Sequence, residues 1–149
     1  MEFNRNGILF KYPDNWIIEE NTSPDGVFGI TASAPDGAFW SLSRQAANAD
    51  FEYFITSTTK QLRGEYPDLE VYPRSEDISG TSLSGADFNF SYLDLTNTAE
   101  VRCLSTPTAC YVVFCQAEDR DWSRLRHVFK AMVTSFIRET IGNNPSSDK

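Results

Sequence analysis

The chain has 149 residues, of which 40% are hydrophobic and 13% aromatic, and its 13 basic and 21 acidic residues give a net charge of −8. This length and composition fit one domain whose core needs neither disulfides nor a metal. Binding to polyanions depends on clustered Lys and Arg, and the sequence has no such run. The acidic balance therefore excludes nucleic acid and anionic membrane surfaces as expected partners.

No stretch approaches the roughly 18 apolar residues that a membrane-spanning helix requires. Residues 1–7 lack the basic and apolar regions of a signal peptide, and no cysteine precedes Cys103, so no lipobox is visible. We expect a soluble cytoplasmic protein, and an exported form stays open if a leader was trimmed.

The first part of the chain predicts two strands around a proline turn. An apolar strand over about 8–12 leads into Tyr-Pro-Asp-Asn at 12–15, and a strand over about 16–20 begins with Trp16. Proline fixes φ and pushes the preceding residue into an extended conformation, while Asp and Asn suit turn positions. The pattern predicts that the two strands pair as a hairpin and that the Trp16 indole packs inward, against the C-terminal helix or over the sheet edge.

Two further turns divide the following region. Ser-Pro-Asp-Gly at 23–26 precedes an expected strand over about 27–33, and Pro-Asp-Gly at 35–37 precedes a strand on which Trp40 and Leu42 share a face. These segments predict short antiparallel strands.

The hydrophobic period then becomes that of a helix. Apolar residues recur with i, i+3, i+4 spacing along about 50–65, which predicts an amphipathic helix. Asp50 is placed as its N-cap, and Gly64 and Pro67 mark its end.

Strand patterns return after this helix. A short strand is predicted at 69–72, and the glycine-bounded segment 80–85 leads into a clean alternation over 86–92. Asn97 is expected to turn the chain into the next strand. On that strand Val101 and Cys103 share one face, and Glu100 and Arg102 face the other way.

The last strand and the last helix complete the pattern. After a turn at 106–108, residues 110–115 are apolar on both faces, which is typical of a strand in the middle of a covered sheet. An apolar stripe predicts a helix over about 120–138, and Asp119 and Asp121 in or before its first turn complement the helix dipole.

The order of strands, helix, strands and helix predicts an α+β fold, with a central, mainly antiparallel sheet and two principal helices packed on it. We expect a single domain over 1–141 and a disordered tail at 142–149, because the tail offers nothing to bury.

In order and spacing, the motifs resemble the PsbP-like family, whose fold is shared with DcrB-type bacterial proteins and a nuclear Ran-binding protein. The resemblance spans about residues 8–138. It rests on these segments: the opening motif at 10–16, the mid-chain helix, the strand at 80–92, the run at 111–114 and the stripe at 129–136. It implies an antiparallel sheet with helices packed on it, and it implies an accessory or binding role without a specific activity.

The sequence offers few candidates for catalysis. His127 is the sole histidine, and it lies about 200° around the last helix from the core residue Phe129, at 100° per residue, so it is expected to face solvent. A histidine base must converge on a nucleophile in a cleft. The apolar surroundings of Cys115 argue for an inert thiol.

Other polar motifs also have structural interpretations. The acidic cluster 118–121 could hold a cation or an acid/base pair, but capping and dipole compensation explain it better, and it lacks the ligand order of a calcium loop. Segment 80–85 lacks the Lys-Ser/Thr of a phosphate-binding loop and leads into a strand, so a hairpin connection or bulge is favoured. Trp16 and Trp40 could line a pocket, although strand aromatics usually pack the core.

Cys103, Cys110 and Cys115 form an odd set without metal-ligand spacing, which predicts three free thiols and no metal; a Cys103–Cys110 bridge across a hairpin stays open. We predict no catalytic residues, no cofactor and no metal site. The expected function is a non-enzymatic accessory or protein-binding domain whose partner is another protein. The alternative is a small-molecule-binding or enzymatic domain with an aromatic and carboxylate cleft, which a deep pocket with convergent polar groups would favour.

Overall fold

The computed structural model describes residues 1–142, so the predicted disorder of the tail falls, from residue 143 on, outside the described residues. The strands and helices follow in chain order: β1 (Glu2–Arg5), β2 (Ile8–Lys11), β3 (Ile17–Thr22), β4 (Phe28–Ser33), β5 (Phe39–Gln45), α1 (Phe51–Glu65), β6 (Glu70–Ile78), β7 (Thr81–Tyr92), β8 (Leu95–Ser105), β9 (Cys110–Glu118), α2 (Asp119–Phe136) and the short π-helix η1 (Ile137–Ile141).

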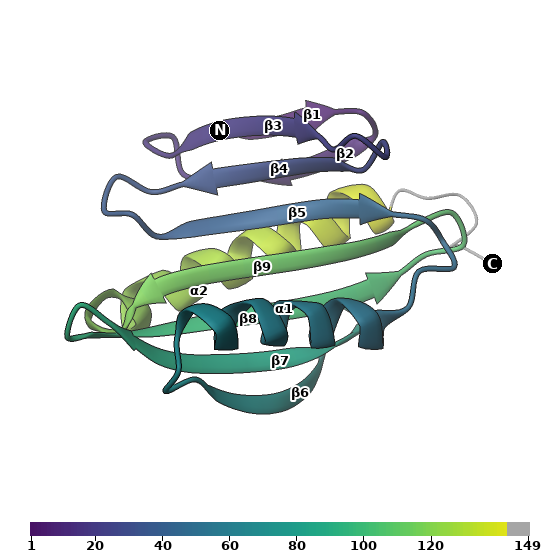
Figure 1. Ribbon diagram of the computed structural model, residues 1–149. Coiled ribbons are helices and arrows are strands. Elements are labelled where there is room, and N and C mark those ends of the chain that lie inside the picture. The colour runs from purple at the N-terminus through teal and green to yellow at the C-terminus, as the bar shows by residue number, and fades with distance from the viewer. Residues whose placement is uncertain (143–149) are drawn as a thin grey trace.

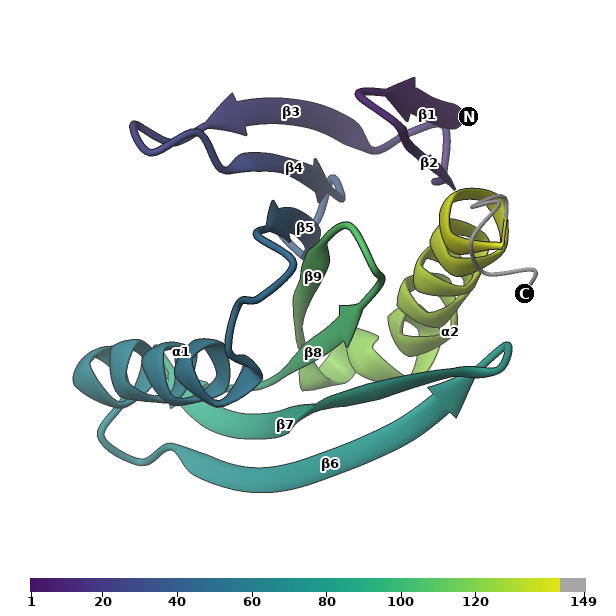
Figure 2. The ribbon, with the colours of Figure 1, turned by 90° about the vertical axis from the view of Figure 1, so that its right-hand side faces the viewer.

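Seven strands form one antiparallel sheet in the order β3-β4-β5-β9-β8-β7-β6, and β1 and β2 form a separate two-stranded sheet (Figure 1). The predicted α+β class is confirmed. The apolar run that predicted a central strand lies in β9, the middle strand of the seven. Figure 2 shows that the large sheet is strongly curved, with α2 on its concave side and α1 on the opposite face.

The predicted hairpin between the first two strands is wrong. β2 pairs with β1, and β3 pairs with β4 instead. Asn6 and Gly7 join β1 to β2 with φ values of 54° and 80°, and an Asn-Gly pair with two positive φ angles is the preferred two-residue hairpin loop. The Tyr-Pro-Asp-Asn segment connects the small sheet to the large one, and Trp16 N–H donates to the carbonyl of Pro13 at 3.1 Å.

The turn predicted at Asn97 is also wrong. The chain reverses at Leu93 and Asp94, whose φ angles are 52° and 64°, and Tyr92 lies opposite Leu95. Asn97 lies within β8, where its buried amide donates to the Leu95 carbonyl at 3.2 Å. Leucine seldom adopts a positive φ, so Leu93 argued against a turn here, and Asp94 was its one weak signal.

The glycine-bounded segment 80–85 is mostly strand. Only Gly80 lies in the connection, next to Ser79, and the rest belongs to β7. A Cβ on Gly85 would lie 1.8 Å from the carbonyl oxygen of Val101 on β8, so only glycine allows the two strands to approach this closely.

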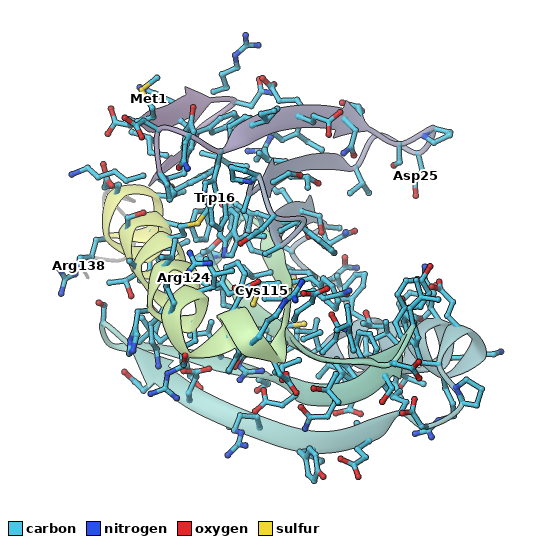
Figure 3. The ribbon with its side chains drawn as sticks, turned by 90° about the vertical axis from the view of Figure 1, so that its left-hand side faces the viewer. Met1, Trp16, Asp25, Cys115, Arg124 and Arg138 are labelled. Carbon is cyan, nitrogen blue, oxygen red and sulfur yellow. The ribbon has the colours of Figure 1, made fainter. Side chains whose placement is uncertain are left out.

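Both helices begin near where the sequence predicts. The Asp50 side chain caps α1 by accepting from Glu52 N–H at 3.0 Å. The apolar stripe of α2 is buried against the concave face of the sheet, with Phe129 at its centre. Trp16 is 8% exposed and its ring meets Phe129 edge-on at 6.0 Å between ring centroids, which confirms that it packs against the C-terminal helix (Figure 3).

Candidate functional site

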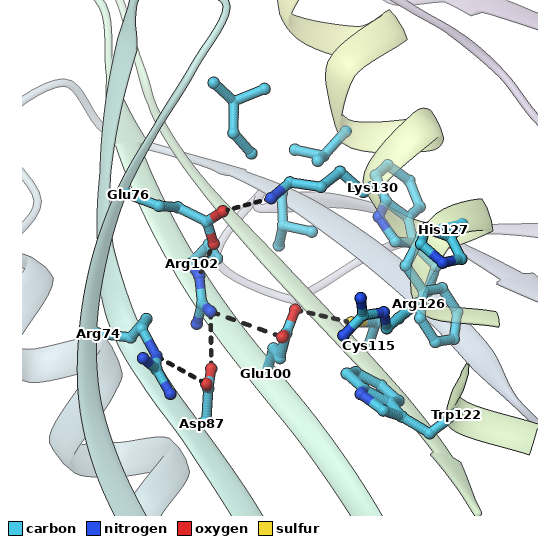
Figure 4. Close-up of a pocket in the computed structure, with 15 residues that line it drawn as sticks. Arg74, Glu76, Asp87, Glu100, Arg102, Cys115, Trp122, Arg126, His127 and Lys130 are labelled. Carbon is cyan, nitrogen blue, oxygen red and sulfur yellow. Dashed lines mark hydrogen bonds and ion pairs between the residues drawn. The ribbon is translucent and has the colours of Figure 1, made fainter. Parts of the chain in front are cut away.

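A cavity of about 390 Å³ lies between α2 and the concave face of the sheet. Strands β5 to β9 supply its floor, and α2 supplies its opposite wall. The lining combines six aromatic or aliphatic side chains with seven charged ones, together with Cys115 and His127 (Figure 4). It consists of these residues: Trp40, Arg74, Glu76, Ile78, Asp87, Glu100, Arg102, Val113, Cys115, Trp122, Arg126, His127, Phe129, Lys130 and Val133.

Arg102 is the centre of the charged part and is only 6% exposed. Its Nε donates to Glu76 on β6, and its Nη2 donates to Asp87 on β7 at 2.6 Å. Its Nη1 donates to the backbone carbonyls of Ala86 and Val101 at 3.1 and 2.9 Å. A buried guanidinium needs this degree of pairing, because an unpaired buried charge is strongly destabilising.

Strand register brings these groups together. Glu100 and Arg102 alternate with Val101 along β8, as the sequence predicted, and Glu100 lies opposite both Asp87 on β7 and Cys115 on β9. Side chains directly opposite on one face of a sheet are neighbours.

Two outer cations extend the network. Lys130 on α2 reaches across the cavity to Glu76 at 3.0 Å, and Arg74 on β6 pairs with Asp87 at 2.9 Å. Figure 4 shows Lys130 and Arg102 contacting the two different oxygens of the Glu76 carboxylate. The Glu76 carboxylate thus links α2 to the sheet.

The carboxylates of Glu76 and Glu100 have opposite pKa shifts. Burial acts to raise the pKa of Glu76, but hydrogen bonds from Arg102 and Lys130 together lower it below its ordinary value. Burial raises the pKa of Glu100, and Arg102, which is 3.6 Å away, offsets this only in part because Asp87 and Glu76 repel the ionised form. Burial acts to lower the pKa of Arg102, but its carboxylate partners raise it, so the cation is retained.

Cys115 lies beside Glu100, and its Sγ donates to Oε1 at 3.9 Å. Complete burial and the adjacent carboxylate raise the pKa of this thiol well above its ordinary value. Because the thiolate is the nucleophilic form, this environment suppresses thiol reactivity.

The apolar wall is formed by rings from both sides of the cavity. Trp40 on β5 is buried, and Trp122 on α2 packs against Phe129 with 5.8 Å between ring centroids. Of the two tryptophans that the sequence suggested for a pocket, Trp40 lines the cavity and Trp16 packs behind Phe129.

The histidine and the acidic cluster lie where the sequence predicts. His127 is exposed on α2, at the rim of the cavity. Within 118–121, Glu118 pairs with Arg120 at 2.7 Å, Asp121 pairs with Arg124 at 3.4 Å, and Asp119 accepts from the Thr98 hydroxyl at 2.6 Å. The cluster is satisfied by the protein itself.

All three cysteines are buried as free thiols. Val112 lies opposite Cys103 and Ser105 lies opposite Cys110, so the two cysteines are not cross-strand partners. Burial raises the pKa of Cys103 to about 12. Across residues 1–142, no three His, Cys, Asp or Glu side chains are grouped so that they could hold a metal ion.

Sequence reasoning missed the network itself. The one feature of the sequence that indicated this network was the pair of opposite charges at Glu100 and Arg102, on a strand with apolar neighbours. Charges at such positions require partners, but those partners come from β6, β7 and α2, and their register is not readable from the sequence.

No protein-family model matches the chain, and the search of curated proteins gives no significant match. Solved structures do resemble it. Cyanobacterial PsbP (CyanoP) of Synechocystis has a TM-score of 0.61 at 13% identity, covering 91% of this chain and 89% of that one. PA94 of Pseudomonas aeruginosa, a protein of unknown function described as a candidate regulator, has a TM-score of 0.52 at 15% identity over 91% and 94%.

LpqN of Mycobacterium tuberculosis, described as involved in cell envelope biogenesis, has a TM-score of 0.53 at 17% identity over 83% of this chain and 78% of that one. The chain therefore has a PsbP-like fold, in agreement with the resemblance of its motifs. At these identities the similarity shows the fold alone. No helix within residues 1–142 combines the length and apolar character that crossing a membrane demands.

Proposed function

We propose that this chain is a non-enzymatic binding domain and that a small ligand binds in the cavity between α2 and the sheet. The proposal is based on the cavity itself. Its volume of about 390 Å³ lies within the roughly 300–1,000 Å³ typical of ligand sites. It also combines an apolar wall with a few convergent polar groups, which is the arrangement that such sites share.

The lining indicates which part of a ligand each wall would contact. Trp122 and Phe129 offer ring surface to an apolar group. Glu100 is the least paired carboxylate of the network, because its distance to Arg102 is 3.6 Å whereas Glu76 and Asp87 both accept closer bonds. A hydroxyl or amine on the ligand would find an acceptor at Glu100.

We propose binding without catalysis because the reactive groups in the cavity are either inactive or already paired. The Cys115 thiol has a raised pKa and an acidic neighbour, which is the reverse of an activated nucleophile. The Arg102 guanidinium is occupied by protein carboxylates and carbonyls. These groups hold the walls together, and they are not free to act on a substrate.

The test is amide chemical-shift mapping of the ¹⁵N-labelled protein against a panel of small alcohols, amines and carboxylic acids that carry an aromatic or aliphatic group. We expect saturable shifts confined to the elements that line the cavity, β5 to β9 and α2. Trp122→Ala, which removes part of the apolar wall, should abolish them. Tyr53→Ala is the matched control, since it truncates an exposed aromatic residue of α1, on the other face of the sheet.

Shifts that survive Trp122→Ala, or that map to α1, would overturn the cavity as the site. Glu100→Gln separates the polar contact from the apolar one, because it keeps the side-chain shape and removes the charge. Protein binding, the role expected from the sequence, requires a surface instead of a cavity, and it stays a prediction.

A further inference from the structure

Positive charge is concentrated on one segment of this acidic chain. From Trp122 to Arg138 the sequence has four of the 13 basic residues and none of the 21 acidic ones. With the net charge of −8, this leaves the rest of the chain at −12. The segment runs along α2 into η1.

These charges lie along the exposed side of the helix, and Arg126, His127 and Lys130 also border the cavity. Because the apolar stripe of α2 turns toward the sheet, Arg126, His127, Lys130 and Arg138 are exposed. Lys11 on β2 adjoins them, since its N–H donates to the Ser135 hydroxyl at 2.8 Å. We call Lys11, Arg126, His127, Lys130 and Arg138 the basic ridge. Figure 3 shows Arg138 pointing away from the body of the molecule.

Much of this charge has no acidic partner among the described residues. Within residues 1–142, the side chains of Arg126 and His127 make no hydrogen bond or ion pair. The Arg138 Nε donates at 3.3 Å to the neutral Ser79 hydroxyl, and Lys130 pairs with the carboxylate of Glu76.

The groove beside the ridge is lined by small side chains at Ala131, Thr134 and Ser135. Acidic groups meet the ridge at two places: Glu76 pairs with Lys130, and Glu139, which also lines the groove, lies with Glu2 near Lys11. An extended chain could therefore approach the ridge without meeting bulky side chains along the groove.

We propose that the basic ridge docks a short acidic segment of a partner protein. This inference deepens the protein-binding role and is argued from the charge along α2; Arg126, His127 and Lys130 of the ridge also border the cavity. From Arg126 to Arg138 the ridge extends roughly 18 Å at about 1.5 Å per helical residue. An extended segment of about five or six residues, at about 3.3 Å each, matches that length.

The charge outside the ridge favours a short protein segment over a larger polyanion. Duplex DNA and an anionic membrane present their charge over an area wider than one helix. Docking on either would bring acidic surface of this protein against negative charge, which costs free energy. A short acidic segment contacts the ridge alone.

The test uses a fluorescein-labelled hexaglutamate peptide, with anisotropy measured at low ionic strength. Arg126→Glu/Arg138→Glu alters the ridge, and Lys60→Glu/Arg63→Glu makes the same change on exposed positions of α1. Each pair of reversals takes the net charge from −8 to −12. We expect the ridge variant to bind at least about tenfold more weakly, and the α1 variant to stay within about threefold of the wild type. Arg126→Gln/Arg138→Gln should give an intermediate loss.

Equal weakening in both double variants would mean that only net charge matters, and it would overturn the ridge as a site. A wild-type protein that does not bind the peptide would overturn the proposal as well. Tighter binding to duplex DNA or to phosphatidylserine vesicles than to the peptide, lost in the ridge variant, would replace the protein segment by that polyanion. The shift mapping that tests the cavity uses the wild-type protein, Trp122→Ala and Tyr53→Ala, so its result does not depend on the ridge variants.

Discussion

The two faces of the large sheet are covered in different ways. On the concave face, α2 and the small sheet enclose a core of 24 buried hydrophobic residues, together with the Arg102 network and the cavity. On the other face, α1 covers a core of seven, and Leu62 is the one residue of the helix that is buried. Because stability follows buried apolar area, most of it should depend on the α2 face. The same face holds the buried charges and the cavity, so substitutions there that alter the proposed ligand site should also alter stability.

The largest expected effect is at Trp16, which packs on Phe129 of α2. Trp16→Ala should lower the free energy of unfolding by about 3–5 kcal/mol, a large share of the roughly 5–15 kcal/mol that stabilises a domain. Trp16→Phe should be partly tolerated, because it keeps an aromatic contact. Urea denaturation of both variants decides the point; a wild-type midpoint for Trp16→Ala would contradict burial of the indole.

Replacement of Arg102, the central cation, should lower the free energy of unfolding almost as much as Trp16→Ala does. Arg102→Met keeps the length of the side chain but leaves Glu76, Asp87 and Glu100 without their shared partner, and we expect a loss of about 3–5 kcal/mol at pH 7. The loss should shrink as the pH falls, because protonated carboxyls no longer repel one another. Denaturation midpoints from pH 7 down to pH 4 measure it. A loss independent of pH would assign the effect to packing alone.

Leu62→Ala tests the lightly covered face. Leucine truncations cost about 2–5 kcal/mol, and we expect about 2 kcal/mol here because the α1 core is small and open at its edge. The consequence should be local: α1 should become sensitive to proteolysis while near-ultraviolet circular dichroism from the tryptophans, which lie on the other face, persists. Loss of both signals together would mean that the two faces unfold as one unit.

The fold was predictable from the sequence wherever periodicity and capping agree. The alternation over 86–92 and the stripe of α2 both follow from burying apolar side chains on one face. The errors fall at connections. Asn6-Gly7 was an available hairpin signal, but the proline motif directed attention to the wrong pairing. The turn at Leu93-Asp94 left only the weak signal of Asp94, because leucine seldom adopts a positive φ.

The site was predictable only in part. The alternation of Glu100 and Arg102 with Val101 placed two charges on one face of β8. What made them a site is long-range register, which brings Glu76 and Asp87 from neighbouring strands and Lys130 from α2. A cavity depends on how far a helix sits above a sheet, and no local pattern in the sequence encodes that distance.

The smallest and most diagnostic effect compares the two glutamates of the network. Glu76 has a pKa below its ordinary value of 4.5, so its ionised form stabilises the folded state. Its contribution is present above that value and is lost as the pH falls through the lowered pKa. Glu100 has a raised pKa, so the folded state favours its protonated form, and the stability that this provides at low pH is lost as the pH rises through the raised pKa.

Neutral substitutions should therefore have opposite signs. At pH 7, Glu76→Gln should lower the free energy of unfolding by about 1–3 kcal/mol, because charged hydrogen bonds from Arg102 and Lys130 are lost. Glu100→Gln should stabilise by up to about 1 kcal/mol, because it removes a poorly compensated charge from the cavity. The stability difference between each variant and the wild type should become smaller toward acid pH. The difference for Glu100→Gln should shrink first, as the pH falls toward 4.5. Urea denaturation midpoints across pH 3–8 measure both differences. If Glu100→Gln destabilised as much as Glu76→Gln, both carboxylates would be structural partners of Arg102. No acceptor would then be left in the cavity for a ligand.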